Sequence, residues 1–124
     1  MDVQTSNTLP KKERLCGKTG IEKLLAKGRH GNVSDLRYIY LTGTEMPYNR
    51  ILVSVPKKFF KRAVKRNLLK RRIRESWRKQ KHDLRVPNGT DILFMYSTKE
   101  ILTYQEIHAR IGQIIEQINE KSAK

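Results

Sequence analysis

The chain has 124 residues, the size of one domain, and carries 27 Lys and Arg against 12 Asp and Glu, which gives a formal charge of +15. Such an excess of positive charge destabilises a compact chain by self-repulsion and is usually offset by a polyanionic partner. Composition therefore disfavours an ordinary charge-balanced enzyme, and it leaves nucleic acid and an anionic membrane surface as candidate partners.

The membrane alternative needs an apolar segment or a lipidation signal, and neither is visible. No run approaches the roughly 20 apolar residues of a membrane span, and the polar segment Met1 to Lys12 lacks the apolar core of a signal peptide. We therefore expect a cytoplasmic protein. Cys16 is the single cysteine, which excludes a disulfide framework and a thiolate-rich zinc site.

The pattern predicts a flexible basic arm over residues 1–12, one α+β domain over residues 13–120 and a tail over residues 121–124. Thr19 and Glu22 have the spacing of a capping box that opens a short first helix. Gly28 would end this helix in the left-handed conformation.

Two segments rich in β-branched and aromatic residues, 38–42 and 51–55, predict strands. The turn formers Gly43, Pro47 and Asn49 lie between them, so the two strands are expected to pair antiparallel. The nearly continuous apolar run 91–96 predicts a further strand that is covered on both faces.

The last predicted helix begins at a capping box formed by Thr103 and Glu106, with Leu102 placed to pack on Ile107. Isoleucines repeat along it at helical spacing, so this face must pack on the sheet. The expected fold is α+β, with a mostly antiparallel sheet of about four strands packed with helices in the order α-β-β-(β)-α-β-α.

Residues 57–81 hold 13 Lys or Arg and one acid, Glu75. On a helical wheel Leu69, Ile73 and Trp77 fall on one side, which must face the core. Ordinary solvated helices mix Glu with Lys, whereas like charges at these spacings destabilise a helix by roughly 0.2 to 0.5 kcal/mol per pair. An external polyanion would relieve that repulsion. The opposite arc forms a solvent-facing stripe about 21 Å long, made of Asn67, Lys70, Arg71, Arg74, Arg78 and Lys81.

Residues 53–58 read Val-Ser-Val-Pro-Lys-Lys, and residues 63–75 contain Arg66-Asn67-Leu68 followed by Ile73-Arg74-Glu75. This order resembles the bacterial ribonuclease P protein family, in which a strand and a lysine pair precede a basic helix with an Arg-Asn-Arg motif. Residues 102–106 also agree, and the likeness covers about residues 11–118.

Three departures from the family pattern concern contacts rather than membership. One is a residue inserted between Lys58 and Ala63. Leu68 replaces the second arginine of the motif. The role that this arginine has in relatives is therefore taken by neighbours such as Lys65 or Arg72, or is not performed. Ile21 and Leu25 stand where relatives usually carry phenylalanines on the first helix.

The resemblance implies a left-handed β-α-β crossover through the basic helix and a role as protein subunit of ribonuclease P, the endoribonuclease that removes the 5′ leader of precursor tRNA. The implied partners are the catalytic RNA and precursor tRNA, with no obligate protein partner. The expected RNA-binding residues are Lys57, Lys58, Lys61, Arg62, Lys65, Arg66, Asn67, Lys70, Arg71, Arg74 and Arg78.

The resemblance also implies a cleft that holds the single-stranded leader. Tyr38 and Tyr40 alternate onto one strand face and are the candidates for stacking on leader bases, with Ile21 and Leu25 as apolar neighbours. An equally weighted alternative is that both tyrosines pack in the core or at an edge.

The chain has few groups for protein-only hydrolysis of a phosphodiester, which needs clustered carboxylates or paired histidines. His30 is expected in a loop and His82 and His108 on helices, while the aspartates are dispersed as turn or cap residues. Chemistry is therefore assigned to the RNA subunit with Mg²⁺, and no catalytic residue is expected in the protein. The alternatives are a ribosomal protein or RNA chaperone and, less well supported, a DNA-binding regulator.

Overall fold

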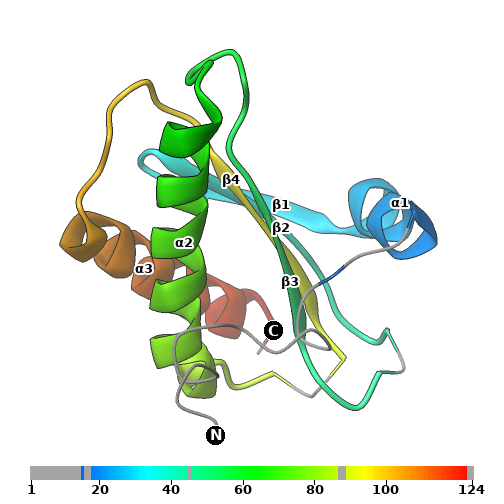
Figure 1. The fold of residues 1–124 in the computed structure, drawn as a ribbon. Coiled ribbons are helices and arrows are strands. Elements are labelled where there is room, and N and C mark those ends of the chain that lie inside the picture. The colour runs from blue at the N-terminus through cyan, green and yellow to red at the C-terminus, as the bar shows by residue number, and fades with distance from the viewer. Residues whose placement is uncertain (1–14, 16–17, 45, 87–88, 123–124) are drawn as a thin grey trace, which may run out of the picture.

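The computed structural model describes residues 15, 18–44, 46–86 and 89–122 (Figure 1). Its α+β architecture confirms the predicted fold class. The predicted arm lies outside the described residues, and residues 121 and 122 of the predicted tail belong to the last helix. The elements are α1 (Lys18–Lys27), β1 (Arg29–Val33), β2 (Leu36–Leu41), β3 (Arg50–Ser54), α2 (Ala63–Gln80), the 3₁₀ helix η3 (Lys81–Asp83), β4 (Asp91–Tyr96) and α3 (Tyr104–Ser122).

The four strands form one mixed sheet in the order β1-β2-β4-β3. β4 pairs antiparallel with β2, where Leu93 lies opposite Ile39, and parallel with β3, where it lies opposite Leu52. The prediction that segments 38–42 and 51–55 pair with each other is therefore wrong. β4 is buried along almost its whole length, and such a strand is most stable in the middle of a sheet with both faces covered.

β1 was not predicted as a strand, because Arg29–Val33 contains Gly31 and Asn32 and a single β-branched residue. It pairs antiparallel with β2 through a tight turn at Ser34, whose φ of 52° lies in the left-handed region. His30, expected in a loop, is therefore a strand residue opposite Ile39.

Alternate residues of the strands face two different layers. Helices α2 and α3 cover one face of the sheet, where Ile92 and Phe94 of β4 join the main core (Figure 1). α1 lies on the other face, where Leu24 packs with Ile39 and Leu93 in a smaller cluster. This second face is only partly covered, since Leu41, Leu52 and Met95 remain partly exposed on it.

Gly28 follows the last residue of α1, but it does not adopt the left-handed conformation predicted for it. Among the glycines that the structure describes, only Gly43 and Gly89 have a positive φ. A Cβ atom on Gly28 would lie 2.4 Å from Ile39 Cγ2 and 2.4 Å from the Leu24 carbonyl oxygen. Glycine is therefore required here by the close approach of α1 to β2.

The start of α3 follows the prediction. The Thr103 amide donates to Glu106 Oε1 at 2.9 Å, and the Glu106 amide donates to Thr103 Oγ1 at 3.2 Å, which together form the capping box. Leu102 and Ile107 are both buried in the main core. None of the helices that the structure describes is long and apolar enough to span a membrane.

Candidate RNA-binding surface

One side of α2 is anchored in the core as predicted. Leu69 and Ile73 are 0% exposed and Trp77 is 1% exposed. The Trp77 ring lies 5.8 Å from that of Phe94 in β4, and Ser76 beside it is also buried. α2 is therefore held against the sheet, and its orientation leaves the opposite side toward solvent.

The opposite side of α2 carries the basic groups. Asn67 and Arg71 are exposed there, and Lys70 and Arg74 are partly exposed. Lys65, one turn before Leu69, is exposed at the start of the helix. The loop that leads into the helix adds four further exposed cations, so the charged surface continues past the helix start. These four are Lys57, Lys58, Lys61 and Arg62.

The first turn of α2 has neither an acidic residue nor a side-chain cap, since Arg62 makes no capping hydrogen bond. Arg66 Nη1 instead reaches back and donates to the main-chain carbonyls of Phe60 at 2.7 Å and Lys61 at 2.9 Å. Arg66 therefore fixes the loop that carries the lysines, a role that a helical wheel does not reveal.

Two further arginines of α2 have partners within the protein. Arg78 donates to both carboxylate oxygens of Glu75, at 2.7 and 3.0 Å. The hydrogen bond from Arg78 lowers the pKa of Glu75, and the same bond raises the pKa of Arg78. Arg72 Nη1 donates to the Leu102 carbonyl at 2.5 Å and so ties α2 to the start of α3. Of the two neighbours considered as substitutes for the missing motif arginine, Lys65 is the exposed one.

The predicted leader-cleft residues do not lie together. Tyr38 and Tyr40 are 1% and 2% exposed and belong to the core under α2 and α3. The Tyr38 hydroxyl donates to Gln117 Oε1 at 2.6 Å. Ile21 packs in the smaller cluster on the other face of the sheet, so the proposed grouping of Tyr38 and Tyr40 with Ile21 and Leu25 is wrong.

The partly covered face of the sheet carries a different set of side chains. Register places Arg37 between Asn32 of β1 and Met95 of β4, all on the α1 side. A hollow of about 430 Å³ opens there and includes His30 and Ile39. The alternation of residues along a strand would have predicted that Asn32, Arg37 and Met95 share a face if β4 had been expected to pair with β2.

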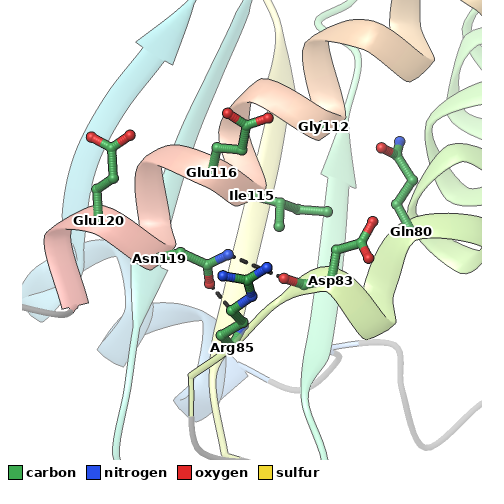
Figure 2. A pocket seen from close by; sticks show the side chains of 8 residues that line it. All are labelled: Gln80, Asp83, Arg85, Gly112, Ile115, Glu116, Asn119 and Glu120. Atoms are coloured by element: carbon green, nitrogen blue, oxygen red, sulfur yellow. Dashed lines mark hydrogen bonds between the residues drawn. The ribbon is translucent and has the colours of Figure 1, made fainter.

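The end of the molecule formed by η3 and α3 has a different charge. Residues 82–124 contain five Lys or Arg and six Asp or Glu, whereas residues 1–81 contain 22 and six. A hollow of about 430 Å³ at this end includes the carboxylates of Asp83, Glu116 and Glu120. Figure 2 shows Asn119 there, bonded to the Arg85 amide and the Asp83 carbonyl. The basic surface therefore does not extend over this end of the molecule.

Within the described part of the chain, no three His, Cys, Asp or Glu side chains come together to hold a metal ion. Asp91 is a buried strand residue rather than a turn residue, and it pairs with Arg50 at 2.8 Å. His82 lies 3.5 Å from Asp83 on an exposed surface.

Comparison with known proteins decides the family. A family model described as Ribonuclease P matches residues 9–119. The chain belongs to the ribonuclease P protein family. A ribonuclease P protein component of Petrotoga mobilis is 36% identical over 117 residues, which are 90% of this chain and 95% of the relative. One of Porphyromonas gingivalis is 45% identical over 76 residues, which are 60% of this chain and 56% of the relative, so this match spans a little over half of that protein.

Solved structures of the ribonuclease P family share the fold. The protein of Thermotoga maritima superposes with a TM-score of 0.73 at 24% identity, covering 86% of this chain and 97% of that one. A Staphylococcus aureus protein gives a TM-score of 0.72 at 21% identity, covering 85% and 94%. The arrangement of α2 against the mixed sheet is therefore shared by family members whose sequences have diverged widely.

Proposed function

We propose that this chain is the protein subunit of ribonuclease P, which binds the catalytic RNA and the 5′ leader of precursor tRNA and supports removal of that leader. The observation that carries the proposal is the two-sided character of α2. Leu69, Ile73 and Trp77 are fully buried, while Asn67, Lys70, Arg71 and Arg74 line the opposite side.

The catalytic RNA would lie along α2 and the loop before it. Guanidinium groups donate two parallel hydrogen bonds to a phosphate, and ammonium groups add compact charge. Since the first turn of α2 has no side-chain cap and no acid, its free amide groups also favour a phosphate. If six to eight cations neutralise phosphates, the log–log slope of affinity against salt should be roughly −5 to −7.

The leader would bind on the partly covered face of the sheet rather than on the buried tyrosines. Arg37 supplies a cation and a planar group there, and the partly exposed Met95 supplies apolar surface beside the buried Ile39. Ile21 of α1 adds to this face, and Leu25 is 50% exposed on the same helix. Because the described side chains of this hollow offer no exposed tyrosine, leader affinity should depend on Arg37 and apolar contact more than on aromatic stacking.

Mg²⁺ would be held in the holoenzyme mainly by RNA and substrate. The described residues bring together no donor set that suits a resident metal, so no step of the reaction is assigned to a protein-bound ion. The contribution of the protein is to neutralise crowded phosphates and to hold the substrate.

Reconstitution tests the proposal. Adding the protein to its cognate ribonuclease P RNA at low Mg²⁺ should restore precursor-tRNA cleavage. The variant Lys70→Glu/Arg71→Glu/Arg74→Glu should lose assembly while its circular dichroism is unchanged. A matched reversal at three exposed cations outside the surface, Lys18→Glu/Arg85→Glu/Lys99→Glu, should assemble normally.

Failure of cleavage with RNA binding intact would indicate a pure RNA-binding module, such as a ribosomal protein or an RNA chaperone. Equal loss of assembly in both triple variants would show that total charge, rather than the α2 surface, determines binding. A preference for duplex DNA over structured RNA at matched salt would favour the DNA-binding alternative.

A further inference from the structure

We propose that a second hollow, between α1 and the end of β2, binds a phosphate group. The hollow has a volume of about 300 Å³ and lies against the edge of the sheet where β2 and α1 approach each other. It lies on the same face of the sheet as the hollow proposed for the leader but shares no lining residue with it, and it is separate from the α2 surface, so it goes beyond the proposed function. The side chains that carry the argument are Thr19, Lys23, Lys27, Thr42 and Arg50.

α1 lies between this hollow and the hollow proposed for the leader. At ~100° per residue, Lys23 and Lys27 lie about 200° around the helix from Ile21 and Leu25 respectively. Leu24 is fully buried between these two flanks and points toward the sheet. The apolar flank therefore borders the leader face, and the lysine flank borders the second hollow.

Two cations of the hollow have no counterion among the residues that the structure describes. Lys23 and Lys27 are exposed, and neither ammonium group makes an ion pair or hydrogen bond with any residue that the structure describes. Two like charges at i and i+4 destabilise a helix, so a bound anion would relieve the repulsion.

The carboxylate of this hollow is already neutralised. Asp91 is 1% exposed, and both of its oxygens accept hydrogen bonds from Arg50, at 2.9 Å from Nε and 2.8 Å from Nη2. Arg50 lies opposite Asp91 across the β3–β4 pair, which fixes its guanidinium at the edge of the hollow. The wall therefore carries an excess of two positive charges around a rigid arginine.

The lining suits phosphate in particular. The ammonium groups of Lys23 and Lys27 can bind a tetrahedral oxyanion through charge-assisted hydrogen bonds, and the exposed hydroxyls of Thr19 and Thr42 can donate to the remaining oxygens. A volume near 300 Å³ is at the lower end of small-ligand sites, which fits a phosphate with at most one nucleoside. The phosphate could belong to an RNA backbone or to a free nucleotide or inorganic phosphate.

Amine acetylation of the full chain, read residue by residue by mass spectrometry, tests the proposal. Inorganic phosphate at about ten times its dissociation constant should slow acetylation of Lys23 and Lys27 about tenfold relative to chloride at equal ionic strength, because only the unliganded protein reacts. Lys18 and Lys99 are exposed lysines outside the hollow and should react equally in both salts. Equal behaviour of all four lysines would overturn the proposal.

A substituted protein checks that the same groups bind the ion. The variant Lys23→Gln/Lys27→Gln should lose the phosphate-induced NMR shifts of the Thr19 and Thr42 amides. The matched variant Lys18→Gln/Lys99→Gln should keep them. Persistence of the shifts in the first variant would show that the hollow is not the phosphate site.

Assembly with ribonuclease P RNA in phosphate-free buffer distinguishes the source of the phosphate. Protection of Lys23 and Lys27 by the RNA identifies a backbone phosphate, whereas protection by inorganic phosphate alone identifies a free ligand. Protection by neither contradicts the proposal. Lys65 and Lys70 of α2 report separately on the proposed function. If RNA does not protect these two lysines from acetylation, the proposed function is contradicted, while the effect of inorganic phosphate on Lys23 and Lys27 can still be interpreted.

Discussion

Arg66 and Phe60 are joined across the start of α2 by a 2.7 Å hydrogen bond from the guanidinium to the main-chain carbonyl. A second bond from the same nitrogen reaches Lys61, so one side chain holds the loop that presents four exposed cations. We expect Arg66→Ala to lower the free energy of unfolding by about 1 to 2 kcal/mol, the range for partly exposed charge-assisted hydrogen bonds. Urea denaturation measures this change.

The same variant separates positioning from charge. Arg62→Ala removes an equal charge from an exposed neighbour that makes no capping hydrogen bond. If Arg66 acts by fixing the loop, Arg66→Ala should weaken RNA binding more than Arg62→Ala while the two salt slopes stay equal. Equal affinities for RNA would mean that the hydrogen bonds to Phe60 and Lys61 have no role in binding.

Tyr38 and Tyr40 differ in what their buried hydroxyls contact. The Tyr38 hydroxyl donates to Gln117 and accepts a 3.1 Å hydrogen bond from Lys121, whereas the Tyr40 hydroxyl has no partner among the residues that the structure describes. Tyr38→Phe should therefore cost about 1 kcal/mol of stability, and Tyr40→Phe should be neutral or stabilising. Thermal or urea denaturation compares them.

Both tyrosine variants also address leader binding. Since the two rings face the core under α2 and α3, their affinity for precursor tRNA should equal that of the wild type, whereas Arg37→Ala should weaken it. Loss of affinity in Tyr38→Phe or Tyr40→Phe at unchanged stability would restore the tyrosines to the leader site.

These tyrosines show where the sequence stopped being informative about the fold. A period of two establishes that Tyr38 and Tyr40 share a face, but not which face is covered. That depends on β4, which enters between β2 and β3 from about 50 residues later in the chain than β2. The long periodic helices were predictable because their patterns are local.

The candidate site was predictable to a similar degree. The spacing of Leu69, Ile73 and Trp77 correctly separates the buried side of α2 from its basic side. It does not reveal that Arg66 and Arg72 turn toward main-chain carbonyls, because those carbonyls belong to the flanking loop and to the start of α3. Sequence patterns place a side chain on an arc, and the tertiary fold decides whether it remains available.

Glu75 limits the charge that α2 offers to RNA, because it binds Arg78 through both carboxylate oxygens. Glu75→Gln should release Arg78 toward a phosphate, tighten RNA binding several-fold and steepen the log–log salt slope by about 0.7 to 0.9. Filter binding over a range of salt concentrations measures both effects. Glu120→Gln makes the same change of charge on α3, away from the basic surface, and should leave the slope unchanged. An equal steepening in both variants would indicate a general charge effect.

The capping box of α3 gives the protein an acid-sensitive element. Hydrogen bonds from the Thr103 amide and hydroxyl hold the pKa of Glu106 below its ordinary value. A lowered folded-state pKa stabilises the fold above the unfolded value, and this contribution is lost as pH falls through the folded value. Stability should therefore be level from about pH 7 to 5 and fall below about pH 4.5, a fall that Glu106→Gln should reduce in urea titrations at each pH. Thr103→Ala should cost about 1 kcal/mol at neutral pH. If the loss of stability below about pH 4.5 is the same in Glu106→Gln as in the wild type, other carboxylates cause the acid sensitivity. Glu75 is then the first candidate, because Arg78 lowers its pKa.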